Sequence, residues 1–233
     1  MNSSIIIRVK NEKQAIEKLL KKLTTQTDQD FEVIIVNDNS VDESDKIVFN
    51  YFSKNRAKLI NVPKDKFTYS YALNLGAIKA KGNYLVFLSA HSLPITDIWL
   101  EEGLSNFSDN EIAGVFSYPI PHLDATIPEK FFYGSFANII NGKRKVFTSI
   151  KFGLLGNTNS IIRKDLWEKH HFNEELTLGG EDQEWANYWI KKGYKIIHDP
   201  KFRVYHSHYL GLIGLVKQWY GWHKTGKQVD KLA

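Results

Sequence analysis

The chain has 233 residues, 42% of them hydrophobic, which suits one domain with a substantial core. It contains no cysteine, so disulfides and thiolate metal sites are excluded, and any metal must be held by histidine and oxygen ligands. The net charge of +5 is spread along the sequence, and no recognition motif accompanies it, so no nucleic-acid partner is expected.

The first segment, MNSSIIIRVKNE, has an apolar run of only three residues before Arg8. A signal peptide needs a much longer apolar region. We therefore expect a cytoplasmic protein.

Short β-branched runs alternate with helical patterns up to about residue 90. Strands are expected over 4–9, 31–36, 58–62 and 84–88, with helices over 12–26, 41–54 and 69–80. This rhythm predicts an α/β fold with a mostly parallel, doubly wound sheet. Ligands of such sheets bind beyond the carboxyl ends of the strands, so the polar residues that follow each strand are the first to inspect.

The pattern loosens after Pro94. We expect a helix near 97–107, a strand near 112–118 and a long irregular stretch over 119–156. An irregular stretch of this length indicates a loop that shapes a substrate-binding site. A strand over 158–162, a short helix from Lys164, a helix over 181–192 and strands near 194–198 and 202–206 follow. The two halves, about 1–95 and 96–209, look unlike each other, and the first is the expected nucleotide-binding half.

The last segment, 210–233, is expected to form an amphipathic helix or tail. Five apolar residues fall on one helical face: Leu212, Leu215, Val216, Trp219 and Trp222. This face could dock on the body of the protein or lie in a membrane interface.

Polar residues follow the second and fourth strands at what should be one sheet edge. Asp38, in the run 36–40, could accept hydrogen bonds from a base or a ribose, although Asn39 or Ser40 could merely cap a helix. Ser89 and His91 could bind a diphosphate, and His91 could instead ligate a cation or be a solvated side chain.

Two further motifs come late in the chain. Gly179 and Gly180 lead into Glu181 and Asp182, an acidic pair that suits a general base or simply the start of a helix. His206 and His208 face the same side of an extended segment, so both could reach one site. Neither G-x-G-x-x-G nor G-x-x-x-x-G-K-[ST] occurs where a dinucleotide or P-loop site would need it.

Taken together and in this order, these motifs resemble the inverting family 2 glycosyltransferases with the GT-A fold, of the bacterial surface-polysaccharide type. The resemblance runs from about residue 4 to residue 209, which it implies is a single domain. It implies that the first strand with Lys10 and Asn11, together with Asp38, binds the nucleoside of a nucleotide-sugar donor. Asn74, in the helix before the fourth strand, is assigned to the same donor-binding set, although it could be a buried amide that fixes a neighbouring loop.

The family's Asp-x-Asp metal motif is replaced here by Ser89-Ala90-His91. Tight Mg²⁺ binding needs oxygen ligands and is disfavoured. Mn²⁺ or another divalent cation held by His91, His206 and the donor diphosphate is expected, unless these histidines or a lysine neutralise the diphosphate without metal.

The resemblance makes Asp182 the catalytic base, with Glu181 placing the acceptor or the loop. The expected reaction moves a sugar to a hydroxyl of a glycan or lipid-linked glycan acceptor in one displacement that inverts the anomeric centre. The alternatives are a catalytically inert nucleotide-sugar-binding module of the same fold, a sugar-nucleotide pyrophosphorylase and a nucleic-acid-binding protein. A pyrophosphorylase needs a Gly-rich loop after the first strand, where this chain has Arg8-Val9-Lys10-Asn11.

Overall fold

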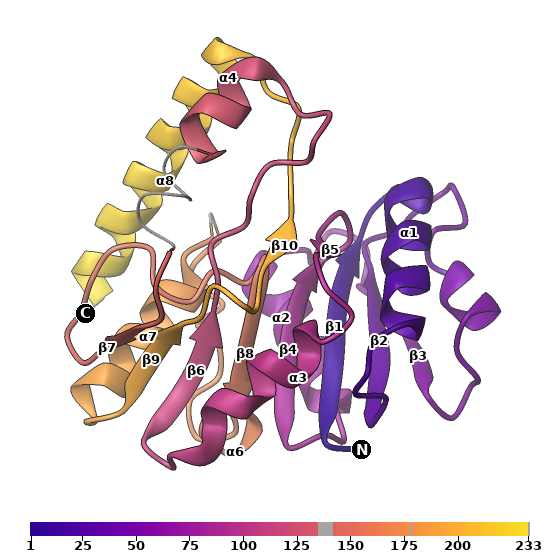
Figure 1. The fold of residues 1–233 in the computed structure, drawn as a ribbon, viewed down its shortest axis with the longest axis horizontal. Helices are drawn as coiled ribbons and strands as arrows, with labels where there is room; N and C mark the ends of the chain where they lie inside the picture. The colour runs from indigo at the N-terminus through magenta and orange to yellow at the C-terminus, as the bar shows by residue number, and fades with distance from the viewer. Residues whose placement is uncertain (135–141, 178, 233) are drawn as a thin grey trace.

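The computed structural model describes residues 1–134, 142–177 and 179–232 (Figure 1). The first half contains β1 (Ser3–Val9), α1 (Lys13–Thr24), β2 (Phe31–Asn37), η1 (Ile47–Asn50), β3 (Ala57–Asn61), α2 (Tyr69–Lys79), β4 (Tyr84–Ser89) and β5 (Leu93–Pro94). The second half contains α3 (Trp99–Leu104), η2 (Ser105–Ser108), β6 (Ile112–Phe116), α4 (Ile127–Glu129), η3 (Lys130–Gly134), β7 (Lys145–Phe147), β8 (Asn159–Arg163), α6 (Lys164–Trp167), α7 (Glu181–Lys191), β9 (Lys195–His198), β10 (Val204–Tyr205) and α8 (Leu212–Leu232).

An eight-stranded sheet with the order β3-β2-β1-β4-β8-β6-β9-β7 forms the centre of the fold. The strands β3, β2, β1 and β4 are parallel, as the sequence predicts. On the other side of β4 the sheet is mixed, because β8 runs antiparallel to both β4 and β6 while β6 and β9 are parallel. Strands from both halves of the chain therefore meet between β4 and β8.

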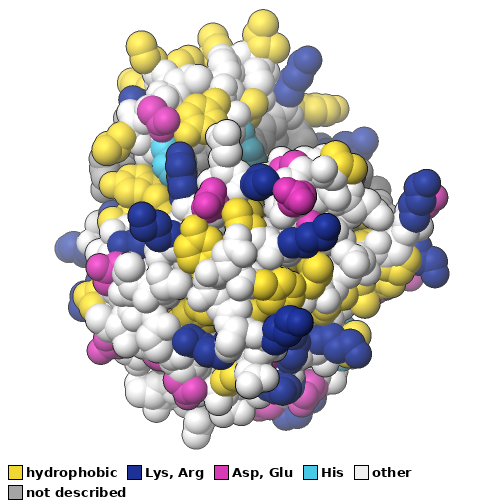
Figure 2. Space-filling view, turned by 90° about the vertical axis from the view of Figure 1, so that its right-hand side faces the viewer, with side chains coloured by type: hydrophobic (Ala, Val, Ile, Leu, Met, Phe, Trp, Pro, Cys, Tyr) yellow, Lys and Arg dark blue, Asp and Glu magenta, His cyan; other side chains and the backbone are white. Residues whose placement is uncertain are grey.

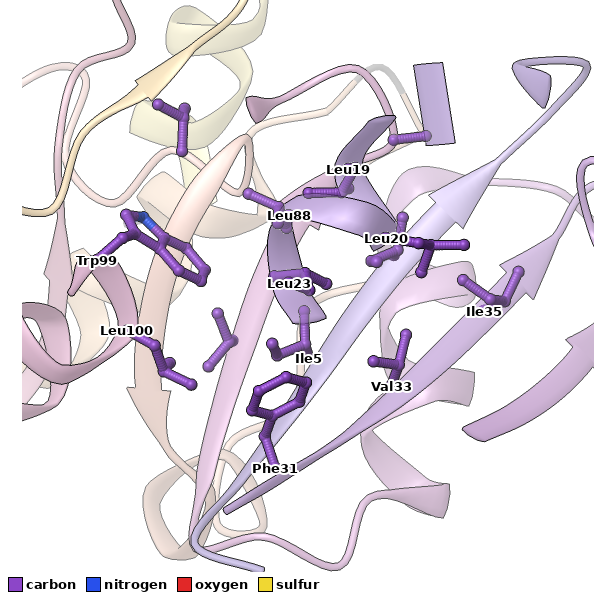
Figure 3. Close-up of a cluster of buried hydrophobic side chains, with 14 of the residues drawn as sticks. Ile5, Leu19, Leu20, Leu23, Phe31, Val33, Ile35, Leu88, Trp99 and Leu100 are labelled. Carbon is purple, nitrogen blue, oxygen red and sulfur yellow. The ribbon is translucent and has the colours of Figure 1, made fainter. Parts of the chain in front are cut away.

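Both faces of the sheet are buried because residues of each strand alternate between two apolar layers. On one face, three leucines of α1 pack against Ile5, Val33 and Ile35 (Figure 3). On the other face, α2, α6 and α7 cover the intervening residues. Gly76 of α2 permits this close packing, because a Cβ atom there would lie 2.5 Å from Ile6.

The predicted helix over 41–54 is wrong. Only η1 is helical there, and Asn39 and Glu43 adopt positive φ angles. Asp42 accepts hydrogen bonds from the main-chain nitrogens of Lys13 and Ser44. Side chains that bond to nearby main chain in this way compete with helix formation.

Two other expectations need correction. The strand expected near 202–206 is reduced to β10, which pairs with β5 in a separate two-stranded sheet. The stretch expected to be irregular over 119–156 contains α4, η3 and β7, and its residues 135–141 lie outside the described part of the chain. Within the described residues, no helix combines the length and the apolar character needed to cross a membrane.

Candidate functional site

The carboxyl ends of β1 and β2 bring Lys10 and Asp38 together. Asp38 is nearly buried, and its Oδ2 accepts a 2.7 Å hydrogen bond from Nζ of Lys10. The main-chain nitrogen of Asp38 also donates to the carbonyl of Val9, which fixes the residue beside β1. The lysine keeps a largely exposed side chain, so this ion pair lies at the surface of the sheet edge.

Asn11 shapes the neighbouring loop. It has a φ of 55°, its side-chain oxygen accepts from the main-chain nitrogen of Val41, and its own nitrogen donates to Ser40. Asn and Asp tolerate this left-handed conformation better than other non-glycine residues. Ser40 caps no helix, contrary to the alternative considered for it, but instead helps to join the loops after β1 and β2.

His91 lies just beyond the end of β4. Ser89 at that end is held by a hydrogen bond from its main-chain nitrogen to the carbonyl of Thr158. The Nδ1 atom of His91 lies 2.6 Å from Oε2 of Glu12. Its Nε2 atom is buried and has no hydrogen-bond partner in the described structure. A carboxylate next to Nδ1 holds the proton there and leaves a lone pair on Nε2, the usual arrangement of a metal-binding histidine.

His206 and His208, after β10, meet His91. Each of the three rings offers a nitrogen, and these atoms lie within 4.8 Å of one another. Ser92 donates its hydroxyl proton to the carbonyl of Thr158, so its oxygen must accept from Nδ1 of His206, 3.1 Å away. This leaves the lone pair of His206 on Nε2, 3.1 Å from Nε2 of His208.

These three histidines fit a divalent transition metal. The unpartnered Nε2 of His91, the accepting Nε2 of His206 and the ring nitrogen of His208 form an imidazole set without a carboxylate ligand. Imidazole suits transition metals, whereas Mg²⁺ prefers oxygen, so oxygen atoms from a ligand would have to complete a Mn²⁺ or Mg²⁺ site. The structure thus brings the predicted His91 and His206 together and adds His208 as a third candidate ligand.

The acidic pair begins α7. Gly180, with a φ of 94°, precedes the helix, and a Cβ atom there would lie 2.7 Å from Thr225 of α8. Asp182 accepts at Oδ2 from the main-chain nitrogen of Asn157, at 3.0 Å. Glu181 is buried, accepts from the side chain of Asn157 through Oε1, and has no partner for Oε2 in the described structure.

The buried surroundings of Asp182 shift its pKa. Burial, followed by the neighbouring charge of Glu181, raises the pKa of Asp182 to about 7, against the lowering effect of its main-chain hydrogen bonds and of Arg8. A carboxylate with a pKa near the working pH is well matched to general-base catalysis.

Arg8 is the charged neighbour that sequence reasoning did not assign to the site. It stands in β1, its guanidinium lies 4.5 Å from the ring centre of Tyr69, and it interacts electrostatically with Glu181 and Asp182. Burial lowers the pKa of Arg8. A charged residue inside the buried run of β1 is the signal that could have revealed it, because such a charge needs a partner.

Asn157 and Thr158 connect the acidic pair to the histidines. Asn157 binds Glu181 and Asp182, while the carbonyl of the next residue, Thr158, accepts from Ser89 and Ser92. These residues precede β8, the strand that joins the two halves of the sheet. One short segment thus contacts the acidic pair directly and reaches His206 through Ser92.

Asn74 makes the contacts expected of a buried amide that fixes a neighbouring loop, which is the alternative to its predicted donor-binding role. Its side chain is buried in α2, where the amide nitrogen donates to the carbonyl of Phe172 and to Glu174. The amide oxygen accepts from Trp167 and from the nitrogen of Phe172. All of its hydrogen-bonding groups are therefore used to hold the segment after α6.

The family profile described as Glycosyl transferase family 2 matches residues 4–170, which include β1 to β8 and the segments that carry Lys10, Asp38 and His91. The chain belongs to this family. Its expected family and GT-A-type α/β fold are thereby confirmed. The match ends before α7 and the late histidines, so the assignment of the acidic pair and His206 to the candidate site depends on the geometry described above.

Two bacterial glycosyltransferases are similar to most of this chain. The O-antigen chain rhamnosyltransferase WbaN of Salmonella anatum is 28% identical over 189 residues, which are 78% of this chain and 58% of that protein. A GalNAc(5)-diNAcBac-PP-undecaprenol beta-1,3-glucosyltransferase of Campylobacter jejuni is 27% identical over 206 residues, 87% of this chain and 63% of that protein. The chain therefore spans about three fifths of the length of these relatives.

Among solved structures, the mannosyltransferase PcManGT of Pyrobaculum calidifontis, in complex with GDP-Man and Mn²⁺, superimposes with a TM-score of 0.69. It is 18% identical, and the match covers 88% of this chain and 56% of that one. At this identity the likeness shows the fold alone, and that fold is the one on which family 2 transferases are built.

Proposed function

We propose that the protein is an inverting glycosyltransferase that moves a sugar from a nucleoside diphosphate sugar to a hydroxyl group of a glycan or lipid-linked glycan. The observation that carries this proposal is that one segment, residues 157–158, binds Asp182 directly and is linked through Ser92 to the cluster of three histidines. A carboxylate with a raised pKa suits a general base, and the linked histidines suit the neutralisation of an anionic leaving group.

In the proposed reaction, Asp182 accepts the proton of the acceptor hydroxyl. The hydroxyl oxygen attacks the anomeric carbon from the face opposite the nucleotide, the bond to the diphosphate breaks, and the electron pair leaves with the diphosphate. Arg8 keeps part of Asp182 ionised, since its charge opposes the effect of Glu181. Inversion follows from a single displacement.

Lys10 and Asp38 form the proposed nucleoside-binding edge, with Asn11 holding the loop beside them and Ser89 ending the adjacent strand. The carboxylate of Asp38 can accept from a base or a ribose hydroxyl once Lys10 shifts or shares it. The lysine is exposed and could pair with the diphosphate instead.

A divalent cation, Mn²⁺ or a similar ion, would be held by His91, His206 and His208 together with oxygen atoms of the donor. When bound, it would neutralise charge that develops on the leaving diphosphate. Glu12 orients His91, and Ser92 orients His206, as carboxylates and hydroxyls do around ligating histidines. The Mn²⁺ in the PcManGT complex supports this part of the proposal.

A lipid-linked acceptor at the cytoplasmic face of a membrane, in the assembly of a bacterial polysaccharide, fits the relatives. The name of the Campylobacter jejuni enzyme specifies a polyprenyl-diphosphate-linked glycan, and that of the Salmonella anatum enzyme an O-antigen chain. Peripheral membrane contact through α8 belongs to the same proposal.

A thermal-shift series with nucleoside diphosphates and their sugars, each with and without Mn²⁺, tests the proposal, because a ligand that binds the native state raises its melting temperature. We expect one base to give a clear shift that Mn²⁺ increases. The Asp38→Ala variant should lose the shift, whereas the matched Asp165→Ala variant, on α6, should keep it. No shift with any nucleotide would contradict the proposal.

A further inference from the structure

An apolar surface covers α4, η3 and the first turns of α8, which stand side by side at one end of the molecule (Figure 1). We call it the α4–α8 surface. Its exposed apolar side chains are Leu123, Ile127, Phe131, Phe132, Leu212, Ile213, Val216, Trp219 and Tyr220. In the space-filling view, hydrophobic side chains project from the upper end of the molecule (Figure 2).

The first turns of α8 are apolar on the side that faces away from the protein. Leu215 is buried against the body, whereas Ile213 is 74% exposed and Val216 and Tyr220 are also exposed. Successive residues of a helix turn by about 100°, so Ile213, Val216 and Tyr220 share the outward side. The apolar stripe that the sequence predicts on this helix is thus divided between the body and solvent.

The two parts of the surface are fixed to each other. Tyr133 of η3 donates to the side chain of Gln218 of α8, and its ring lies 6.1 Å from that of Trp222. Thr126, which caps α4, donates to the carbonyl of Leu210. The exposed apolar groups of both elements therefore form one surface rather than two separate mobile segments.

Lysines accompany this surface. Lys130, Lys217, Lys224 and Lys227 are exposed on η3 and α8. Over 120–134 and 207–229, the acidic residues are only Asp124, which is exposed and accepts from Tyr209, and Glu129, which is buried. Aromatic and aliphatic groups mixed with lysine suit the interface of a membrane that carries anionic lipids.

We propose that the α4–α8 surface docks on an anionic lipid bilayer. The inference deepens the proposed function, on which its biological purpose rests, because it would present the site to a lipid-linked acceptor. Glu129, behind the surface, accepts from the main-chain nitrogen of His208 at 2.9 Å. Docking would therefore hold the membrane in a fixed relation to the histidines.

The charges favour a bilayer over a second copy of the chain as the occupant. In a symmetric dimer through this surface, the four lysines of one copy would face those of the other with little acid to compensate. An anionic bilayer attracts each lysine while it buries the apolar side chains.

Vesicle flotation with the full chain tests the docking proposal separately from catalysis, since it needs neither donor nor acceptor. Vesicles of phosphatidylcholine alone are compared with vesicles that also contain phosphatidylglycerol. We expect the protein to float with the anionic vesicles, and the quadruple variant Ile213→Ser, Val216→Ser, Trp219→Ser, Tyr220→Ser to bind at least about tenfold more weakly. The control, Ile78→Ser with Ile98→Ser, changes exposed isoleucines elsewhere and should bind normally.

A charge series tests the lysines. Lys130→Glu, Lys217→Glu and Lys224→Glu together should abolish the preference for anionic vesicles, whereas the same change at Lys18, Lys54 and Lys169, which are exposed elsewhere, should leave most of it. Equal flotation of the wild type and the quadruple variant would overturn the proposal. So would a dimer of the wild-type protein that the quadruple variant abolishes, without any vesicle binding. Donor binding in the thermal-shift series should be unchanged in the quadruple variant.

Discussion

The Nδ1 atom of His91 and the Oε2 atom of Glu12 lie 2.6 Å apart, and this contact directs the other nitrogen of the histidine towards His206 and His208. The pair joins the loop after β4 to the residue that precedes α1. His91 stands where the family resemblance predicts an Asp-x-Asp motif. Its orientation depends on the carboxylate of Glu12, which follows β1.

Substitutions at Glu12 should reveal this dependence. We expect Glu12→Ala to weaken Mn²⁺ binding by about 10- to 100-fold, as changes behind a ligating histidine usually do, and Glu12→Gln to restore much of it, because the amide oxygen can still accept from Nδ1. His91→Ala should remove the site, and His223→Ala, an exposed histidine on α8, should not. Electron paramagnetic resonance of Mn²⁺ with and without nucleoside diphosphate measures the affinities. Equal affinities in all variants would exclude these histidines as ligands.

The role of Asp182 as base predicts a separation of binding from turnover. Asp182→Asn keeps an oxygen that can accept from Asn157 but cannot take a proton, so we expect turnover to fall by about 10²- to 10⁴-fold with donor affinity unchanged. Asp165→Asn, a matched change of an exposed aspartate on α6, should be neutral. Near-normal turnover of Asp182→Asn would transfer the base role to Glu181 or to another residue.

The raised pKa of Asp182 predicts two pH effects. Turnover should decline about tenfold per pH unit below pH 7, as the base becomes protonated. Because the folded pKa exceeds the model value of 3.8, the native state binds more protons than the unfolded state between about pH 4 and pH 7. The contribution of this group to stability is therefore present at low pH and is lost as the pH rises through 7.

Urea denaturation of Asp182→Asn checks the sign of the second effect. The free energy of unfolding of the variant minus that of the wild type should be larger at pH 8 than at pH 5. The reason is that the variant lacks the buried carboxyl group that is costly to ionise. A difference between variant and wild type that does not change with pH would show that Asp182 has an ordinary pKa.

Much of the fold could be predicted because its elements carry strong local patterns. The runs that form β1 and β2 are rich in β-branched residues, the run that forms β4 is aliphatic and aromatic, all three are largely buried, and α1 has a clear apolar face. The region after β2 could not be predicted from periodicity, since Asp42 and the positive φ angles of Asn39 and Glu43 override its helical pattern. Where side chains bond to nearby main chain, hydrophobic spacing alone is misleading.

The site was predictable at its strand ends and less so elsewhere. Asp38 and His91 follow buried strands directly, so sheet topology places them at one edge. Arg8 and Asn157 gain their roles from contacts with the acidic pair, which is far away in sequence. No local pattern reports such a contact, although a charge inside a buried strand indicates that one exists.

Asn74 illustrates a residue whose position suggested binding and whose contacts indicate packing. We expect Asn74→Ala to lower the free energy of unfolding by about 2–3 kcal/mol, because Trp167 and the nitrogen of Phe172 lose their buried acceptor. Asn55→Ala, at an exposed position, should have little effect. Urea denaturation measures both, and nucleotide affinity is measured in parallel. A large loss of donor affinity at unchanged stability would return Asn74 to the donor site.

The most direct test of the central claim is the stereochemistry of transfer. Proton NMR monitors the anomeric configuration of the sugar while the enzyme slowly hydrolyses the nucleotide sugar that binds best, with water in place of the acceptor. The account predicts that the sugar first released has the anomeric configuration opposite to that of the donor, and that Asp182→Asn releases it far more slowly. First release of the sugar with the donor's own configuration, or equal rates in the two proteins, would contradict the account.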